Sequence, residues 1–274
     1  MNNLLHADFR RLLRDRLFWV LTAVMAIWAI ILFLNHYSDK IRYGEQASLD
    51  SMFFSFAVLT GFASAAFCSL FTGREHSDGI LRNKIIIGCS RTRIYLSGFL
   101  TCAAAMLLST FAYMAVLCVL GIPVFGLFEG DPGGLLLIFA ASALLNLVHV
   151  ALFHLVSMLN SSKSASAIIC MALSLLLLVA ASLLLQRLAQ PELIQQVQMV
   201  DGSPVVSQAA NPKYLTGSTR ILYQFFVDLL PSGQALQIAS AQVAHPIQIL
   251  LYSSGVTVLL NLIGIYLFNR KNLK

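Results

Sequence analysis

Long, uninterrupted apolar runs alternate with short polar segments along this chain. Six runs reach about the 17–25 residues that a helix needs to cross a bilayer. They are approximately Leu17–Leu34, Met52–Thr72, Tyr95–Gly121, Leu135–Leu159, Ala165–Leu188 and Ile247–Phe268. Strands of a transmembrane barrel would instead alternate apolar and polar residues over about ten positions. The pattern therefore predicts an all-α integral membrane protein, with residues 1–274 forming a single transmembrane domain.

The polar segments predict further short helices outside the six spans. Residues 1–16 form a basic amphipathic helix that leads into the first span as an elbow, and such helices rest in the headgroup plane. The residues expected at the membrane surface are Phe9, Arg10, Arg11, Leu12, Leu13 and Arg14. Residues 189–246 contain an Asp201-Gly202 turn between two extended pieces, then two short helices broken at 231–233. We expect these helices to dip into or lie on the outer leaflet.

Composition and charge add an orientation to this picture. The chain is 58% hydrophobic and only 11% charged, against about 25% charged residues in soluble domains. With the amino terminus in the cytoplasm, 13 of the 18 Lys and Arg residues lie on the cytoplasmic side, as the positive-inside rule requires. We therefore expect a multi-pass protein of a bacterial-type cell membrane, with both termini and the loop 73–94 in the cytoplasm.

The loop 73–94 carries more than orienting charge. Apolar and basic residues alternate within it at helical spacing, and two glycines bracket them as helix ends. The bracketing glycines are Gly79 and Gly88, and the spaced residues are Ile80, Leu81, Lys84 and Ile85. A short helix with an apolar stripe outside the hydrocarbon needs a surface to cover it. Either a partner protein or the lipid surface, which attracts basic residues, would meet that need.

Candidate chemistry inside the spans is sparse. His149 and His154 are five residues apart and point about 140° from each other on a helix, so we favour buried hydrogen-bonding roles over a metal site. The five cysteines show no CxxC spacing and fit small apolar packing positions. Phosphate-loop, HExxH and GxSxG motifs are absent from the sequence. We expect no catalytic residue, no cofactor site, no metal site and no nucleic-acid partner.

A stripe of small residues recurs at every fourth position of the second span: Ala57, Gly61, Ala65, Ser69 and Gly73. Small stripes let helix backbones approach closely in lipid. Packing within the chain is the favoured interpretation, and an interface between subunits is the alternative.

Two segments carry a resemblance to a known family. "REHSDGILRNKIIIGCSRTRIYLS" (Arg74–Ser97) resembles the cytoplasmic loop after the second span in permease subunits of type 2 ABC exporters. "NPKYLTGSTRILYQFFVDLLPSGQALQ" (Asn211–Gln237) resembles the outer segment before the last span of the same family. The family's usual Gly-Thr-Ile is here Gly79-Ile80-Leu81.

The resemblance implies a permease paired with a second permease copy, as a homodimer or close heterodimer, and with a separate ABC ATPase that binds ATP and Mg²⁺. The residues that would couple the chain to the ATPase are Glu75, Gly79, Ile80, Leu81, Arg82, Asn83, Lys84, Ile85 and Gly88. Ile80, Leu81 and Ile85 would enter a groove on the ATPase. Arg82, Asn83 and Lys84 would make wet contacts at its edge, so that Lys84→Ala would be mild.

The same resemblance places the first, second and fifth spans around the cargo path. Gly61, Ala65 and Met171 are the candidate lining residues, and a peptide, a lipid or a drug-like molecule would fit as cargo. A secondary transporter or channel is a rival class, but ion coupling would need ionisable residues in the spans, and only the two histidines are found. An intramembrane hydrolase, using Ser64 or Ser174 with a histidine, is a further rival without a supporting motif.

Overall fold

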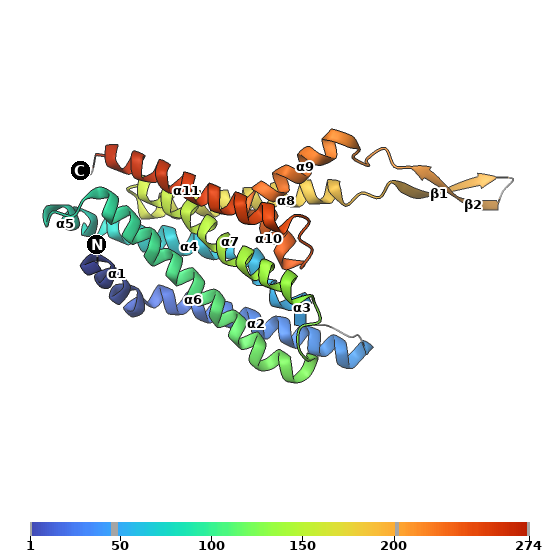
Figure 1. The fold of residues 1–274 in the computed structure, drawn as a ribbon, viewed down its shortest axis with the longest axis horizontal. Helices are drawn as coiled ribbons and strands as arrows, with labels where there is room; N and C mark the ends of the chain where they lie inside the picture. Colours follow the sequence, from blue (N-terminus) through green and yellow to red (C-terminus); the bar gives the residue numbers. More distant parts are fainter. Residues whose placement is uncertain (1, 45–48, 201–202, 273–274) are drawn as a thin grey trace.

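The protein is an elongated bundle of helices with a β-hairpin projecting from it (Figure 1). The computed structural model describes residues 2–44, 49–200 and 203–272. Its helices are α1 (Asn2–Arg14), α2 (Arg16–Tyr43), α3 (Leu49–Phe53), α4 (Phe56–Ser77), α5 (Ile80–Ile86), α6 (Arg91–Phe125), α7 (Pro132–Leu159), α8 (Lys163–Leu188), α9 (Gly217–Leu229), α10 (Pro231–Ala239) and α11 (Pro246–Arg270). The strands are β1 (Leu193–Val200) and β2 (Ser203–Ala210).

Within the described residues, six helices are long and apolar enough to cross a membrane: α2, α4, α6, α7, α8 and α11. The six predicted spans are confirmed. The first span runs on to Tyr43, well past the predicted end, and the second is preceded by the separate short helix α3.

Both chain ends and α5 lie at one end of the bundle, and the hairpin extends from the other (Figure 1). We call these the basic end and the hairpin end. The basic end holds α1, α5 and the loops around them, which carry most of the arginines discussed below. An even number of spans places the two termini together, as the sequence predicts.

Local sequence signals explain where several spans begin. Asp15 precedes α2, and its side chain accepts a hydrogen bond from the Leu17 backbone N–H at 2.9 Å. Asp131 caps α7 in the same way at Gly134, with Pro132 in the first turn. Such caps satisfy backbone donors that the first helical turn leaves unpaired.

The core is organised around α4, which contacts α7, α8, α10, α6 and α2. In the most apolar part of α4, 67% of the residues are buried within the protein, against 22% in α2 and 17% in α8. The small stripe of α4 is buried along its whole length, so its predicted role in packing within the chain is confirmed. The exposed apolar faces of α2 and α8 must be covered by lipid or by another chain.

The segment before the last span is partly inserted into the bundle. The sequence predicts two short helices there, and α9 and α10 confirm it, meeting at Leu230 and Pro231. Helix α10 is buried against α4, α7 and α8, whereas α9 keeps large apolar side chains exposed, among them Ile221 and Leu222. The strands β1 and β2 pair in antiparallel register from Leu193–Ala210 to Val200–Ser203. The Asp201-Gly202 turn predicted between them lies outside the described residues.

Candidate functional site

The site is a cluster of buried charges that ties α5 to the rest of the basic end. Helix α5 begins after Gly79 (φ +67°) and is followed by Gly88 (φ +88°), backbone conformations that favour glycine. The two predicted bends are therefore present. Between them, the same face of the helix buries Leu81 and Lys84, which are three residues apart.

Leu81 anchors the apolar half of this contact. It packs in one cluster with Tyr95 of α6, Met158 of α7 and Phe268 of α11. Because these residues come from three different spans, the position of α5 depends on the arrangement of the whole bundle at its basic end.

Lys84 anchors the charged half. Its Nζ lies 2.9 Å from Oδ1 of Asp8 on α1 and 2.9 Å from Oε1 of Glu75 on α4. The Arg11 guanidinium forms a further ion pair with Glu75, and the Ser97 hydroxyl donates to Asp8 at 2.6 Å. Two carboxylates thus face two cations, and the cluster is neutral overall.

Burial makes this cluster unlike a surface salt bridge. Asp8 is 4% exposed, Glu75 3% and Lys84 8%. Burial alone lowers the pKa of Lys84, but the carboxylates of Glu75 and Asp8 outweigh it and raise the pKa above its usual value. Lys84 is therefore protonated at neutral pH, and each charge depends on its partners, because an unpaired buried charge is costly.

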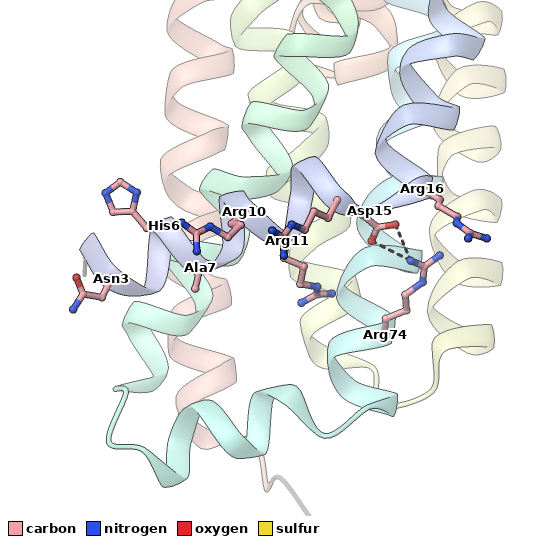
Figure 2. Close-up of a pocket in the computed structure, with 9 residues that line it drawn as sticks. Asn3, His6, Ala7, Arg10, Arg11, Asp15, Arg16 and Arg74 are labelled. Atoms are coloured by element: carbon pink, nitrogen blue, oxygen red, sulfur yellow. Dashed lines mark hydrogen bonds and ion pairs between the residues drawn. The ribbon is translucent and has the colours of Figure 1, made fainter.

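Two further contacts fix the surrounding segments. Arg74 of α4 donates to both carboxylate oxygens of Asp15, at 2.8 and 3.0 Å, and so holds the corner between α1 and α2 (Figure 2). Arg91, at the start of α6, donates to backbone carbonyls of Phe268 and Asn269 at the end of α11. The N-terminal helix, α5 and the C-terminal end of the chain are thus joined at this site.

The buried and exposed residues of α5 differ from those expected from the sequence. Leu81 and Lys84 are buried in contacts within the chain, so neither is available to a partner in this structure. Ile80 and Ile85 are only partly buried. The freely exposed residues are instead Arg82, Asn83, Ile86 and Ile87, the last two being 73% and 77% exposed.

The expected membrane-surface residues of α1 also divide differently. Leu12 is fully buried in the main core, and Arg11 pairs with Glu75 and stacks over the Phe71 ring at 4.4 Å. Leu12 is thus covered by protein, and Arg11 is held by Glu75 while still partly exposed; the place of α1 at a membrane surface stays a prediction. Arg10, Leu13 and Arg14 are exposed, and Phe9 is partly buried. The reason is that α1 packs against α6 and α2, which uses the side of the helix that an isolated amphipathic helix would offer to lipid.

The three candidate path-lining residues are not equivalent. Gly61 and Ala65 are buried, and a side chain added at Gly61 would meet Ser174 and His149 at 3.2 and 3.3 Å. Both residues are used in packing within the chain, and their place along a path stays a prediction. Met171 is 40% exposed and borders an apolar groove between α2, α4 and α8.

The histidines have the predicted role. His149 lies 3.1 Å from the Leu145 carbonyl through Nδ1, and His154 lies 3.1 Å from the Tyr95 carbonyl through Nε2. Both are buried.

Asp8 is the one member of the charged cluster that the sequence interpretation left without a role. It lies on the same helix face as two apolar residues, three positions after Leu5 and four positions before Leu12. An acidic residue on the apolar face of an otherwise basic helix is the signal that could have revealed a buried partner.

Comparison with known families agrees with this geometry. A family model described as ABC-2 family transporter protein matches residues 4–181, well over half of the chain. The chain therefore belongs to the ABC-2 transporter family, and it is a multi-pass membrane protein. Membership implies an ABC ATPase partner and a lipid environment. Among curated proteins, none matches the chain.

Proposed function

We propose that the chain is the permease subunit of an ATP-driven exporter, that α5 receives the ATPase, and that the buried charges carry its movement to α1 and α4. The supporting observation is that α5 has two distinct faces. One is bound to the bundle through Leu81 and Lys84, and the other presents Ile86 and Ile87 beside Arg82 and Asn83.

The ion pairs of Lys84 link the movement of α5 to two other helices. A displacement of α5 pulls on α4 through Glu75 and on α1 through Asp8 at the same time. Helix α4 is the most buried span, so its tilt changes the packing of every helix around it. The ATPase, and not this chain, binds ATP and Mg²⁺ in this proposal, and the basic end faces the cytoplasm of a bacterial-type cell.

The cargo path would form between two copies of the permease. The faces of α2 and α8 are mostly exposed, and the groove beside Met171 lies between them and α4. A second copy against this face, as a homodimer or close heterodimer, would enclose an apolar passage. A peptide, a lipid or a drug-like molecule suits such a passage.

The docking surface is tested by the double variant Ile86→Asp/Ile87→Asp. The assay measures its affinity for an ABC ATPase that co-purifies with the unaltered protein, with both proteins purified. Two charges would enter a desolvated contact, where losses of about 2 kcal/mol or more correspond to at least roughly 30-fold weaker binding.

The matched control is Leu127→Asp, which changes a similarly exposed apolar residue in the loop after α6, away from α5. This control should bind the ATPase as the unaltered protein does. Full binding and full transport by the double variant would show that α5 is not the docking element.

A further inference from the structure

A strongly basic groove of about 930 Å³ lies at the corner where α1, α2 and α4 meet (Figure 2). Five arginines line it: Arg10, Arg11, Arg14, Arg16 and Arg74. They come from three elements, and Asp15 is the only acidic residue among the described residues that line the groove. The groove is therefore shaped by the fold and is not a property of one helix.

Among the described residues, two of these arginines are paired with carboxylates and three are not. Arg11 pairs with Glu75, and Arg74 pairs with Asp15. Within the described part of the chain, no carboxylate lies at ion-pair distance from Arg10, Arg14 or Arg16. Guanidinium groups bind phosphate in a bidentate manner. Arg14 and Arg16, which flank Asp15, are thus unpaired among the described residues and can meet an anion, and Arg10 lies farther along α1 (Figure 2).

A second, apolar groove of about 290 Å³ lies along α2 and α4. It is lined by α2 from Leu17 onward, directly after Arg16, and by Met171 of α8. On α4, Phe67 and Ala63 line it and lie seven and eleven residues before Arg74. These spacings put all three on one face of α4, with Phe67 roughly 10 Å deeper along the helix than Arg74.

We propose that the two grooves together bind one anionic phospholipid, with its phosphate at the Arg14 and Arg16 corner and an acyl chain in the apolar groove. A soluble phosphate would leave the apolar groove empty, and an acidic protein segment has no acyl chain to place there. A molecule with a phosphate and a hydrocarbon chain matches both parts. Its apolar part is the groove beside Met171 that a second copy would enclose under the proposed function, but the binding test below requires no transport.

Trp19 offers a direct probe of this site. It lies at the same corner, is 57% exposed, and its indole donates to the Leu13 carbonyl at 2.9 Å. The chain has two tryptophans, so Trp28→Phe leaves Trp19 alone. This variant is reconstituted in phosphatidylcholine vesicles that contain a small fraction of one brominated lipid. The brominated lipid is either phosphatidylglycerol or phosphatidylcholine, and the bromine lies near the carbonyl end of its acyl chains. Quenching of Trp19 reports which of the two occupies the groove.

We expect brominated phosphatidylglycerol to quench Trp19 preferentially. In Arg14→Gln/Arg16→Gln that preference should fall about 25-fold, because each arginine near anionic lipid contributes about fivefold. The matched control, Arg82→Gln/Arg93→Gln, removes two exposed arginines of the α5 region and should keep the preference. An equal loss of the quenching preference in both double variants would mean that general surface charge attracts the lipid, and would overturn the site.

Filling the apolar groove separates a lipid from other anions. Ala63→Phe should abolish the preference with all arginines intact, and Ala66→Leu in the same groove serves if the larger change prevents folding. A preference that survives the filled groove would show that the headgroup binds without an acyl chain in the apolar groove, and would overturn the two-part site. If brominated phosphatidylglycerol does not quench Trp19 preferentially in the protein with unaltered grooves, the proposal is overturned outright.

Discussion

Replacing Lys84 with methionine should damage this protein far more than its place in a polar loop indicates. The change keeps most of the side-chain volume and removes one charge. Asp8 and Glu75 would then share Arg11 as their only cation in the cluster, at 4% and 3% exposure. In water the two carboxylates would be solvated, but here they have almost no access to it.

The magnitude follows from this burial. Breaking a buried ion pair by removing one partner costs about 3–5 kcal/mol, whereas an exposed pair contributes about 1 kcal/mol or less. On the scale of soluble chains of similar size, a loss of 3 kcal/mol lowers Tm by roughly 6–12 °C. Replacing Lys84 should therefore destabilise the protein strongly, whereas a contact at the solvent-exposed edge of an interface would give only a mild effect.

The assay is thermal unfolding in mild detergent, followed by tryptophan fluorescence. Arg82→Met is the matched control, since it removes an exposed cation from the same helix and should change Tm by no more than about 4 °C, as expected for an exposed charge. Equal Tm values for the two variants would refute the buried cluster.

A charge-balanced variant and a pH series sharpen the test. Asp8→Asn/Lys84→Met leaves Arg11 paired with Glu75 and should recover about 0.5–3 kcal/mol relative to the sum of the single changes. The pKa of Lys84 is raised, so its stabilisation is fully present below the ordinary lysine pKa and is lost only as pH rises through the raised one. The Tm difference between the unaltered protein and Lys84→Met should therefore stay constant across neutral pH. A difference that vanishes there would contradict this assignment.

Three further predictions concern packing and assembly. Gly264→Ala should lower Tm, because the added carbon would collide with the buried Tyr95 side chain, whereas Gly255→Ala on the same helix meets nothing within 4 Å and should not; equal Tm values would contradict the close approach. Asp228→Leu should lower Tm, since this 1% exposed carboxylate accepts from two glutamines and lies 2.9 Å from a histidine nitrogen; an unchanged Tm would show that these partners find others. Val24→Cys should cross-link two copies in the membrane and Val258→Cys should not, although both are exposed; the reverse pattern would move the subunit interface to α11.

Several features of this chain follow from the sequence because they depend on short-range physics. The length of each apolar run determines six spans, since a helix in lipid must satisfy its own backbone hydrogen bonds. Gly79 and Gly88 mark the ends of α5, because the chain needs left-handed backbone conformations there. The even number of spans and the excess of arginines at one end predict that the termini lie together, as they do (Figure 1).

The role of each residue within α5 was beyond the reach of local patterns. Helical spacing shows that Leu81 and Lys84 share a face and that Arg82 does not, but it does not say which face meets the chain itself. That depends on α1, whose Asp8 lies 76 positions away from Lys84 in the sequence, and on spans α6, α7 and α11 closing around Leu81.

The same limit explains α1 and the small stripe of α4. An amphipathic helix has an apolar face that either lipid or protein can cover, and only the packed bundle shows that Leu12 is covered by protein. Gly61 permits close approach to any helix, and the fold assigns it to α7 and α8. The sequence by itself determined which segments cross the membrane and which faces are apolar. The tertiary structure decided which of those faces meet one another, because such contacts join residues far apart in the chain whose partners no local pattern identifies.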